Sequence, residues 1–88
     1  MRVTIIVDDN VVLVQGHPNT VDCSALMTQN IHAVQWYDSW GEVEYAVDLA
    51  SGNRPPNARI SDFSPFQSFL DAWGNEANRP AVSAAAAE

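Results

Sequence analysis

The sequence predicts an α+β fold: a small antiparallel β-sheet of two hairpins, about four strands, with one C-terminal amphipathic helix packed on it. Two pairs of strand-like segments, residues 3–15 and 31–47, predict the sheet. Apolar residues spaced along one helical face between residues 66 and 73 predict the helix. Strands followed by a helix are typical of the α+β class.

The first hairpin is expected from residues 3–7 and 11–15, two β-branched runs separated by Asp8-Asp9-Asn10. Asp and Asn tolerate turn geometry and hydrogen-bond to nearby backbone, so the three residues predict a tight turn. Both runs are apolar at nearly every position, which is typical of strands covered on both faces. We expect a helix over one face, and a second subunit is one candidate for the other.

The second hairpin is expected from residues 31–38 and 42–47, with Ser39-Trp40-Gly41 as its turn. Alternation predicts that Glu42 and Glu44 face solvent. Matching the apolar positions of the two arms places four side chains together on the buried face, where cross-strand aromatic pairs stabilise a sheet. These are Val34, Trp36, Val43 and Tyr45.

A helix start is predicted at Ser64-Pro65-Phe66-Gln67, with Ser64 as the cap, Pro65 in the first turn and Gln67 completing a capping box. Gly74-Asn75 predicts the helix end, although one or two more turns before Pro80 are compatible with the sequence. Four apolar side chains fall at i, i+3, i+4 and i+7 and are expected to dock on the sheet. These are Phe66, Phe69, Leu70 and Trp73.

The connecting segments are predicted from their turn-forming residues. Residues 17–20 and 50–59 are expected to be loops, and residues 21–26 form either a short edge strand or an irregular crossing segment. We therefore expect one α+β domain over residues 1–75, followed by a flexible alanine-rich tail over residues 76–88.

Composition narrows the classes of partner. Four arginines, no lysine and eleven carboxylates give the chain a formal net charge of −7. Such a chain repels phosphate, so we expect neither nucleic acid nor an anionic membrane as a direct partner. The apolar N-terminal run is too short for a signal peptide, and no stretch approaches the roughly 20 apolar residues of a membrane span.

A chain of 88 residues forms a small domain of marginal stability unless something adds to its core. Cys23 is the only cysteine, so no internal disulfide can form. Stability is expected to come from a well-packed aromatic core and from homo-oligomerisation.

No constellation of residues predicts an enzyme or a metal site. Asp8-Asp9-Asn10, even with Asp22, lacks the glycine and the distal glutamate of a calcium loop, and a solvated turn explains it better. His17 and His32 have no nucleophile motif nearby, and Cys23 is better explained as a small buried thiol. We therefore predict no catalytic residue, no metal and no cofactor.

Trp40 and Tyr37 are the candidate partner-binding residues. A tryptophan beside Gly41 at a hairpin tip is hard to bury in so small a domain. Exposed aromatic side chains are enriched among the residues that dominate protein–protein binding. The alternative is that Trp40 folds back onto the sheet or under the loop at residues 50–59, and the sequence does not decide between the two.

Four segments resemble short uncharacterised proteins that tailed bacteriophages and prophages encode near tail or tail-fibre genes. They are Val21-Asp22-Cys23-Ser24, Ile31-His32-Ala33-Val34-Gln35-Trp36-Tyr37, Gly41-Glu42-Val43-Glu44-Tyr45 and Ile60-Ser61-Asp62-Phe63-Ser64-Pro65-Phe66. The pairing of a His-Ala-Val-Gln-Trp strand with a Gly-Glu-Val-Glu-Tyr strand is the most specific element. The resemblance covers residues 1–73 and implies a genomic context without any catalytic residue.

These observations favour a non-enzymatic phage accessory protein, either a minor tail component or a tail assembly factor. It would bind a larger phage tail protein through the aromatic patch of Trp40 and Tyr37 or through an exposed sheet edge, which suits strand addition. Such a protein is expected in the cytoplasm of the host bacterium, and association with the virion is left open. The alternative is a host-directed phage protein that covers a basic surface on a host protein. The even spread of carboxylates along the chain argues against a dense mimic of nucleic acid.

Overall fold

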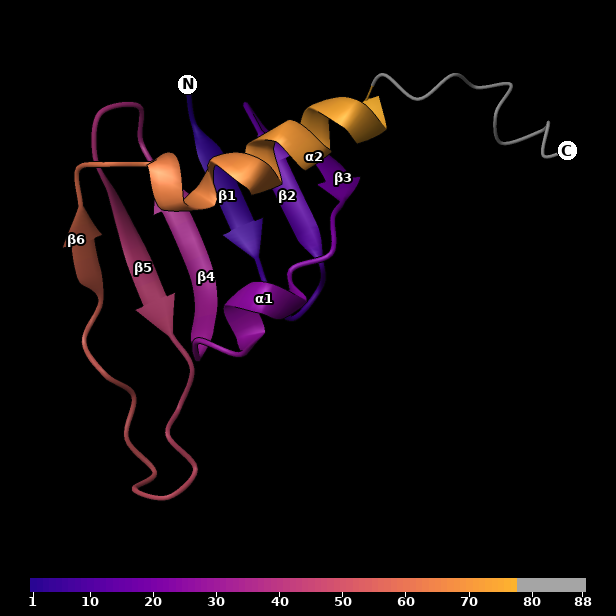
Figure 1. The fold of residues 1–88 in the computed structure, drawn as a ribbon. Helices are drawn as coiled ribbons and strands as arrows, with labels where there is room; N and C mark the ends of the chain where they lie inside the picture. The colour runs from indigo at the N-terminus through magenta and orange to yellow at the C-terminus, as the bar shows by residue number, and fades with distance from the viewer. Residues whose placement is uncertain (78–88) are drawn as a thin grey trace, which may run out of the picture.

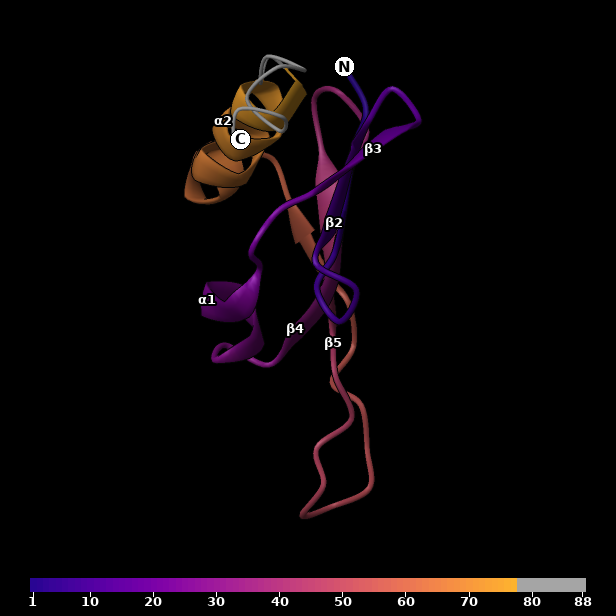
Figure 2. The same ribbon diagram turned by 90° about the vertical axis from the view of Figure 1, so that its right-hand side faces the viewer.

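The fold is a six-stranded antiparallel sheet with its helices on one face, as a computed structural model that describes residues 1–77 shows (Figures 1 and 2). The strands lie in the order β3-β2-β1-β4-β5-β6. Their bounds are β1 (Val3–Ile6), β2 (Val11–Val14), β3 (His17–Thr20), β4 (Ile31–Trp36), β5 (Gly41–Tyr45) and β6 (Ala58–Ile60). The predicted α+β class is confirmed, and the sheet has six strands in place of about four.

The first hairpin is confirmed, because β1 pairs with β2 and Ile6 lies opposite Val11 across the turn. The expected loop at residues 17–20 is wrong, since these residues form β3 beside β2. Gln15 and Gly16 connect the two strands with φ values of 52° and 83°. Positive φ at both central residues is the geometry of a tight two-residue hairpin turn. Glutamine is not one of the residues typical of that turn, so the sequence did not predict it.

Residues 21–26, predicted as either a short edge strand or an irregular crossing segment, form a crossing segment that leads into the short helix α1 (Ser24–Met27). It connects the edge strand β3 to β4 on the helical face of the sheet (Figure 1). Asn10, at φ 53°, holds the start of this crossing. Its carbonyl accepts the Val21 N–H at 2.8 Å, and its side-chain oxygen accepts the Cys23 N–H at 2.9 Å.

The second hairpin has the predicted buried face, since Val34 and Val43 are paired and almost completely buried. Its turn is Asp38-Ser39, one residue earlier than predicted, because the Tyr37 N–H donates to the Trp40 carbonyl at 2.7 Å. Gly41 is therefore the first residue of β5. It lies opposite Trp36, whose ring occupies the space that a side chain at position 41 would need.

The expected loop at residues 50–59 is shorter than predicted, because residues 58–60 form the edge strand β6 against β5. The remaining residues, 46–57, extend beyond the end of the sheet (Figure 1). The Asp48 N–H donates to the Asn53 carbonyl at 2.8 Å, and the Asp48 carboxylate accepts the Ala50 N–H at 3.0 Å. Leu49, within this turn, is 95% exposed.

The C-terminal helix α2 (Gln67–Ala77) follows a single 3₁₀ turn, η1 (Ser64–Phe66). The predicted Ser64 cap is wrong: Ser64 makes no capping bond, and Asp62 accepts its N–H at 2.9 Å and its hydroxyl at 2.8 Å. Gln67 bonds to Asp71 instead of closing a capping box. The helix also passes through Gly74-Asn75, so residues 76 and 77 belong to it, and residues 78–88 of the expected tail lie outside the described residues.

The hydrophobic core lies between the sheet and the helices. The predicted stripe of α2 packs here, with Phe66 and Phe69 buried and Leu70 and Trp73 partly buried against the core. The helix crosses the sheet diagonally (Figure 1), and the Trp73 indole N–H donates to the His17 carbonyl at 2.9 Å. No helix among residues 1–77 is long and apolar enough to cross a membrane.

Cys23, directly before α1, is completely buried in the hydrophobic core, and its thiol donates to the Val21 carbonyl at 3.2 Å. Burial, with a smaller contribution from the charge of Asp22, raises the pKa of the Cys23 thiol above its usual range. The predicted small buried thiol is confirmed.

We expect Gly41→Ala to destabilise the fold by about 2 kcal/mol, because the new methyl group would lie 2.9 Å from the Trp36 ring and closer still to the Gln35 carbonyl. Gly74→Ala is the matched control, since it adds a methyl group in a helix with open space around it. It should stabilise the protein by about 0.5–1 kcal/mol. Urea denaturation of both variants measures the difference, and equal midpoints would contradict the packing of Trp36 on Gly41.

We also expect Cys23 to resist thiol reagents in the folded protein, because only an accessible thiolate attacks them. Labelling with a chromogenic disulfide should be slow in buffer and complete in urea. Rapid labelling of the native protein, at a rate equal to that of the unfolded chain, would contradict the burial of the thiol.

Candidate protein-binding surface

The face of the sheet opposite the helices is not covered by any element among residues 1–77 (Figure 2). We call it the open face. Strand pairing places Thr4 beside Leu13 and Gln35, and Ile6 beside Val11 and Ala33. All but the buried Ala33 are only partly buried. The cover expected over one face of β1 and β2 is provided by the helices, and no described element covers the other face.

Four side chains stack across one end of the open face in the order Arg2, Tyr37, Trp40, Arg59. We call this stack the ladder. The Tyr37 and Trp40 ring centroids are 4.7 Å apart, with 38° between the ring planes. The Arg2 guanidinium lies 5.1 Å from the Tyr37 centroid, and that of Arg59 lies 4.3 Å from the Trp40 centroid. Both distances are within the range of cation–π attraction.

The position of the ladder follows from side-chain alternation. Val3 and Trp36 point into the core, so their neighbours Arg2 and Tyr37 point to the open face. Trp40 precedes Gly41, whose missing side chain would meet the core-facing Trp36 ring. Arg59 is paired with Glu42 between two residues that pack against the core, so it also lies on the open face. The ladder therefore takes its side chains from four adjacent strands or their immediate ends.

The guanidinium groups of the ladder keep free hydrogen-bond donors. Residues 1–77 contain three arginines, Arg2, Arg54 and Arg59, and none of them lies within 4 Å of a described carboxylate. The carboxylates that do form ion pairs bind other groups: Asp38 the amino group of Met1, and Asp8 His32. In a chain of net charge −7, cations without a carboxylate partner remain available to a ligand.

The structure brings the two predicted partner-binding residues, Tyr37 and Trp40, into direct contact. Both are partly buried and lie outside the hydrophobic core that the described residues form. Trp40 folds back onto the sheet, on its open face, and the guanidinium of Arg59, the last residue of the predicted loop at residues 50–59, lies over its ring. Arg2 and Arg59 were not predicted as partner-binding residues. Alternation from Val3 would have placed Arg2, whereas Arg59 depended on β6, which was not predicted.

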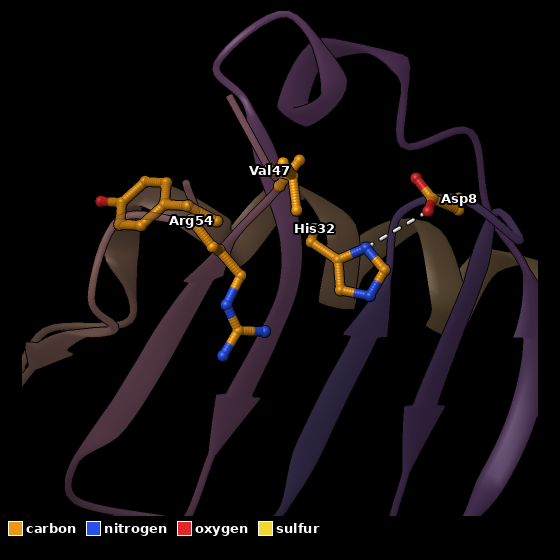
Figure 3. A pocket seen from close by; sticks show the side chains of 6 residues that line it. Asp8, His32, Val47 and Arg54 are labelled. Atoms are coloured by element: carbon orange, nitrogen blue, oxygen red, sulfur yellow. Dashed lines mark ion pairs between the residues drawn. The ribbon is translucent and has the colours of Figure 1, made fainter. Parts of the chain in front are cut away.

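A shallow depression of about 290 Å³ lies at the other end of β4 and β5 (Figure 3). Its lining residues are Asp8, His32, Tyr45, Ala46, Val47 and Arg54. A β-bulge between Ile31 and Ala33 positions His32, whose Nδ1 lies 3.2 Å from a carboxylate oxygen of Asp8. The lining offers a histidine oriented by a carboxylate, without a serine, threonine or cysteine beside it.

Asp22, considered above with Asp8-Asp9-Asn10 for a calcium site, is engaged by a local hydrogen bond, as is Asp62. Asp22 accepts the Ser24 N–H at 2.9 Å, and this bond holds the pKa of the Asp22 carboxyl below its usual range. The Ser64 N–H acts in the same way on the pKa of Asp62. Within residues 1–77, no three histidine, cysteine, aspartate or glutamate side chains gather closely enough to hold a metal ion.

Comparisons with protein-family models, with curated proteins and with solved structures gave no match to this chain.

We expect Trp40→Ala to cost less than about 2 kcal/mol of stability, because Trp40 packs on the open face and not in the core. The matched substitution Trp36→Ala, on the core side of the same hairpin, should cost about 3 kcal/mol or more. Urea denaturation compares the two. A larger loss of stability for Trp40→Ala than for Trp36→Ala would contradict the assignment of Trp36 to the core and of Trp40 to the open face.

Proposed function

We propose that this chain is a non-enzymatic accessory protein of a tailed bacteriophage or prophage, and that it acts by binding a tail protein through its open face. The observation on which the binding role rests is the ladder of two arginines and two aromatic rings on an uncovered sheet face. The resemblance of residues 1–73 supports the phage context.

The residue types of the ladder favour binding to a protein. Tryptophan, tyrosine and arginine are the side chains most enriched among binding hot spots. Stacking also holds each of them in place before a partner arrives, and this lowers the entropy that is lost on association. A ladder of such side chains is therefore a preorganised anchor.

The surroundings of the ladder provide the remaining parts of an interface. Ile6, Val11 and Leu13 form a partly buried apolar area on β1 and β2, and Glu42 and Glu44 add charge on β5. Apolar residues near the centre with charged residues around them are typical of protein interfaces. We propose that a larger tail protein covers this area, either during assembly in the host cytoplasm or in the finished particle.

The test is affinity capture from a lysate of the host after induction, with wild-type protein and the Trp40→Ala variant as matched baits and mass spectrometry as the readout. We expect the wild type to capture phage tail proteins. The variant should lose most of that capture while keeping its fold, because it lacks the central ring of the ladder.

Asp71→Ala is the control, since Asp71 is exposed on α2, on the helical side of the sheet. It should capture the same proteins as the wild type. Equal capture by Trp40→Ala would contradict the ladder as the contact. Recovery of a host enzyme or regulator without phage structural proteins would replace the tail role with the host-directed one.

A further inference from the structure

The two edges of the sheet differ in what they offer to another strand. On β3, the groups that face away from β2 belong to Pro18 and Thr20, because Val14 pairs with His17 across the tight turn and the direction of the backbone groups then alternates. Pro18 has no N–H, so the middle of this edge lacks a donor. Helix α2 also holds β3, through Asn19 to the Trp73 carbonyl at 3.2 Å and through the Trp73 indole to His17.

The β6 edge has neither protection, and no described element lies outside it (Figure 1). The bond from the Tyr37 N–H to the Trp40 carbonyl fixes the direction of the backbone groups along β5. Trp40 faces β4, so Gly41 and Val43 face β6, where they pair with Ile60 and Ala58. The N–H and C=O of Arg59 therefore point away from the sheet.

Arg59 also ends the ladder. Its guanidinium lies on the Trp40 ring, and no described carboxylate is within 4 Å of it. A strand added at β6 would place a side chain of its own directly against this guanidinium, since paired residues share a face. Arg59 thus presents, in the same direction, a backbone donor, a backbone acceptor and a cation that have no partner among the described residues.

We propose that the partner adds an extended strand to β6, with a carboxylate side chain opposite Arg59. This inference deepens the proposed function and rests on it. The pairs Arg59–carboxylate and Tyr37–Trp40 then belong to one continuous surface, the ladder extended by one strand. The residues on either side of the carboxylate are apolar, because they lie beside Ala58 and Ile60, which are partly buried against the core.

A second copy of this chain does not fit this edge in the register centred on β6. Two antiparallel β6 strands would place the Arg59 side chains directly opposite each other, and like charges in that position destabilise a pair. The same charge that disfavours self-pairing favours an acidic partner. Arg59 therefore selects the partner as well as binding it.

The experiment uses the whole protein and a seven-residue peptide, acetyl-Thr-Thr-Val-Glu-Val-Thr-Thr-amide, with the peptide that has lysine in place of glutamate as its control. Backbone amide spectra are recorded during titration. We expect the glutamate peptide to shift the amide signals of residues 57–61 and to protect the Arg59 N–H from solvent exchange. We expect the lysine peptide to bind about tenfold more weakly or not at all.

Two substitutions at one position separate side chain from backbone. Arg59→Ala removes the cation and keeps the backbone N–H, whereas Arg59→Pro removes both. Because the Arg59 N–H makes no bond to β5, we expect the fold to tolerate proline at this position. We expect both to weaken binding of the glutamate peptide, Arg59→Pro by about a further tenfold. Equal affinity of the two variants, shifts confined to β3, or no shift at all would overturn the inference. Capture of tail proteins by the wild type but not by Trp40→Ala, together with such a result, would leave the proposed function in place.

Discussion

Pairing between β1 and β4 joins two halves of the chain that are otherwise local. β1, β2 and β3 form one meander and β4, β5 and β6 another, and each of their pairings connects strands that follow one another in sequence. Among the strand pairings, only that between β1 and β4 closes a long loop, the entropic cost of which must be offset by what the pairing buries. Ile5 and Val34, which face each other there, are both fully buried. The C-terminal segment then reaches across both halves, from Phe63, which precedes η1 and contacts Trp36, to Trp73 of α2, which bonds to His17.

The proposed binding surface depends on the same pairing between β1 and β4. Arg2 belongs to the first meander and Tyr37, Trp40 and Arg59 to the second, so the ladder exists only when β1 lies beside β4. No local segment of the chain contains it. A substitution that weakens the β1–β4 pairing therefore removes the binding surface together with the fold, whereas a substitution in the ladder alone leaves the sheet intact. The core and the proposed interface occupy opposite faces of the same strands, so successive side chains along a strand belong alternately to the core and to the interface.

Period-two alternation predicted the buried face of the second hairpin, and the helical spacing from Phe66 to Trp73 predicted the stripe of α2. Two edge strands were not predictable in this way. β3 contains Pro18, and β6 has three residues next to a run of turn-forming ones, so both are strands because a neighbour pairs with them and not because of their composition. The residues of the candidate site likewise differ in whether the sequence could predict them. Tyr37 and Trp40 could be named from residue type and position, but Arg59 could be placed only after β6 was known.

The segment at residues 46–57 leaves the sheet after β5 and returns at β6 without contributing to any strand register. Its turn is closed by Asp48 and Asn53 and exposes Leu49 to solvent. The chain can therefore lengthen here at small entropic cost, and a protease would cut here first. A cut would divide the protein into a five-strand piece and a shorter piece that contains β6 and α2, which would stay together only through pairing and packing. Pairing between β5 and β6 would then have to form between two separate chains, without the loop that now keeps the two strands close together.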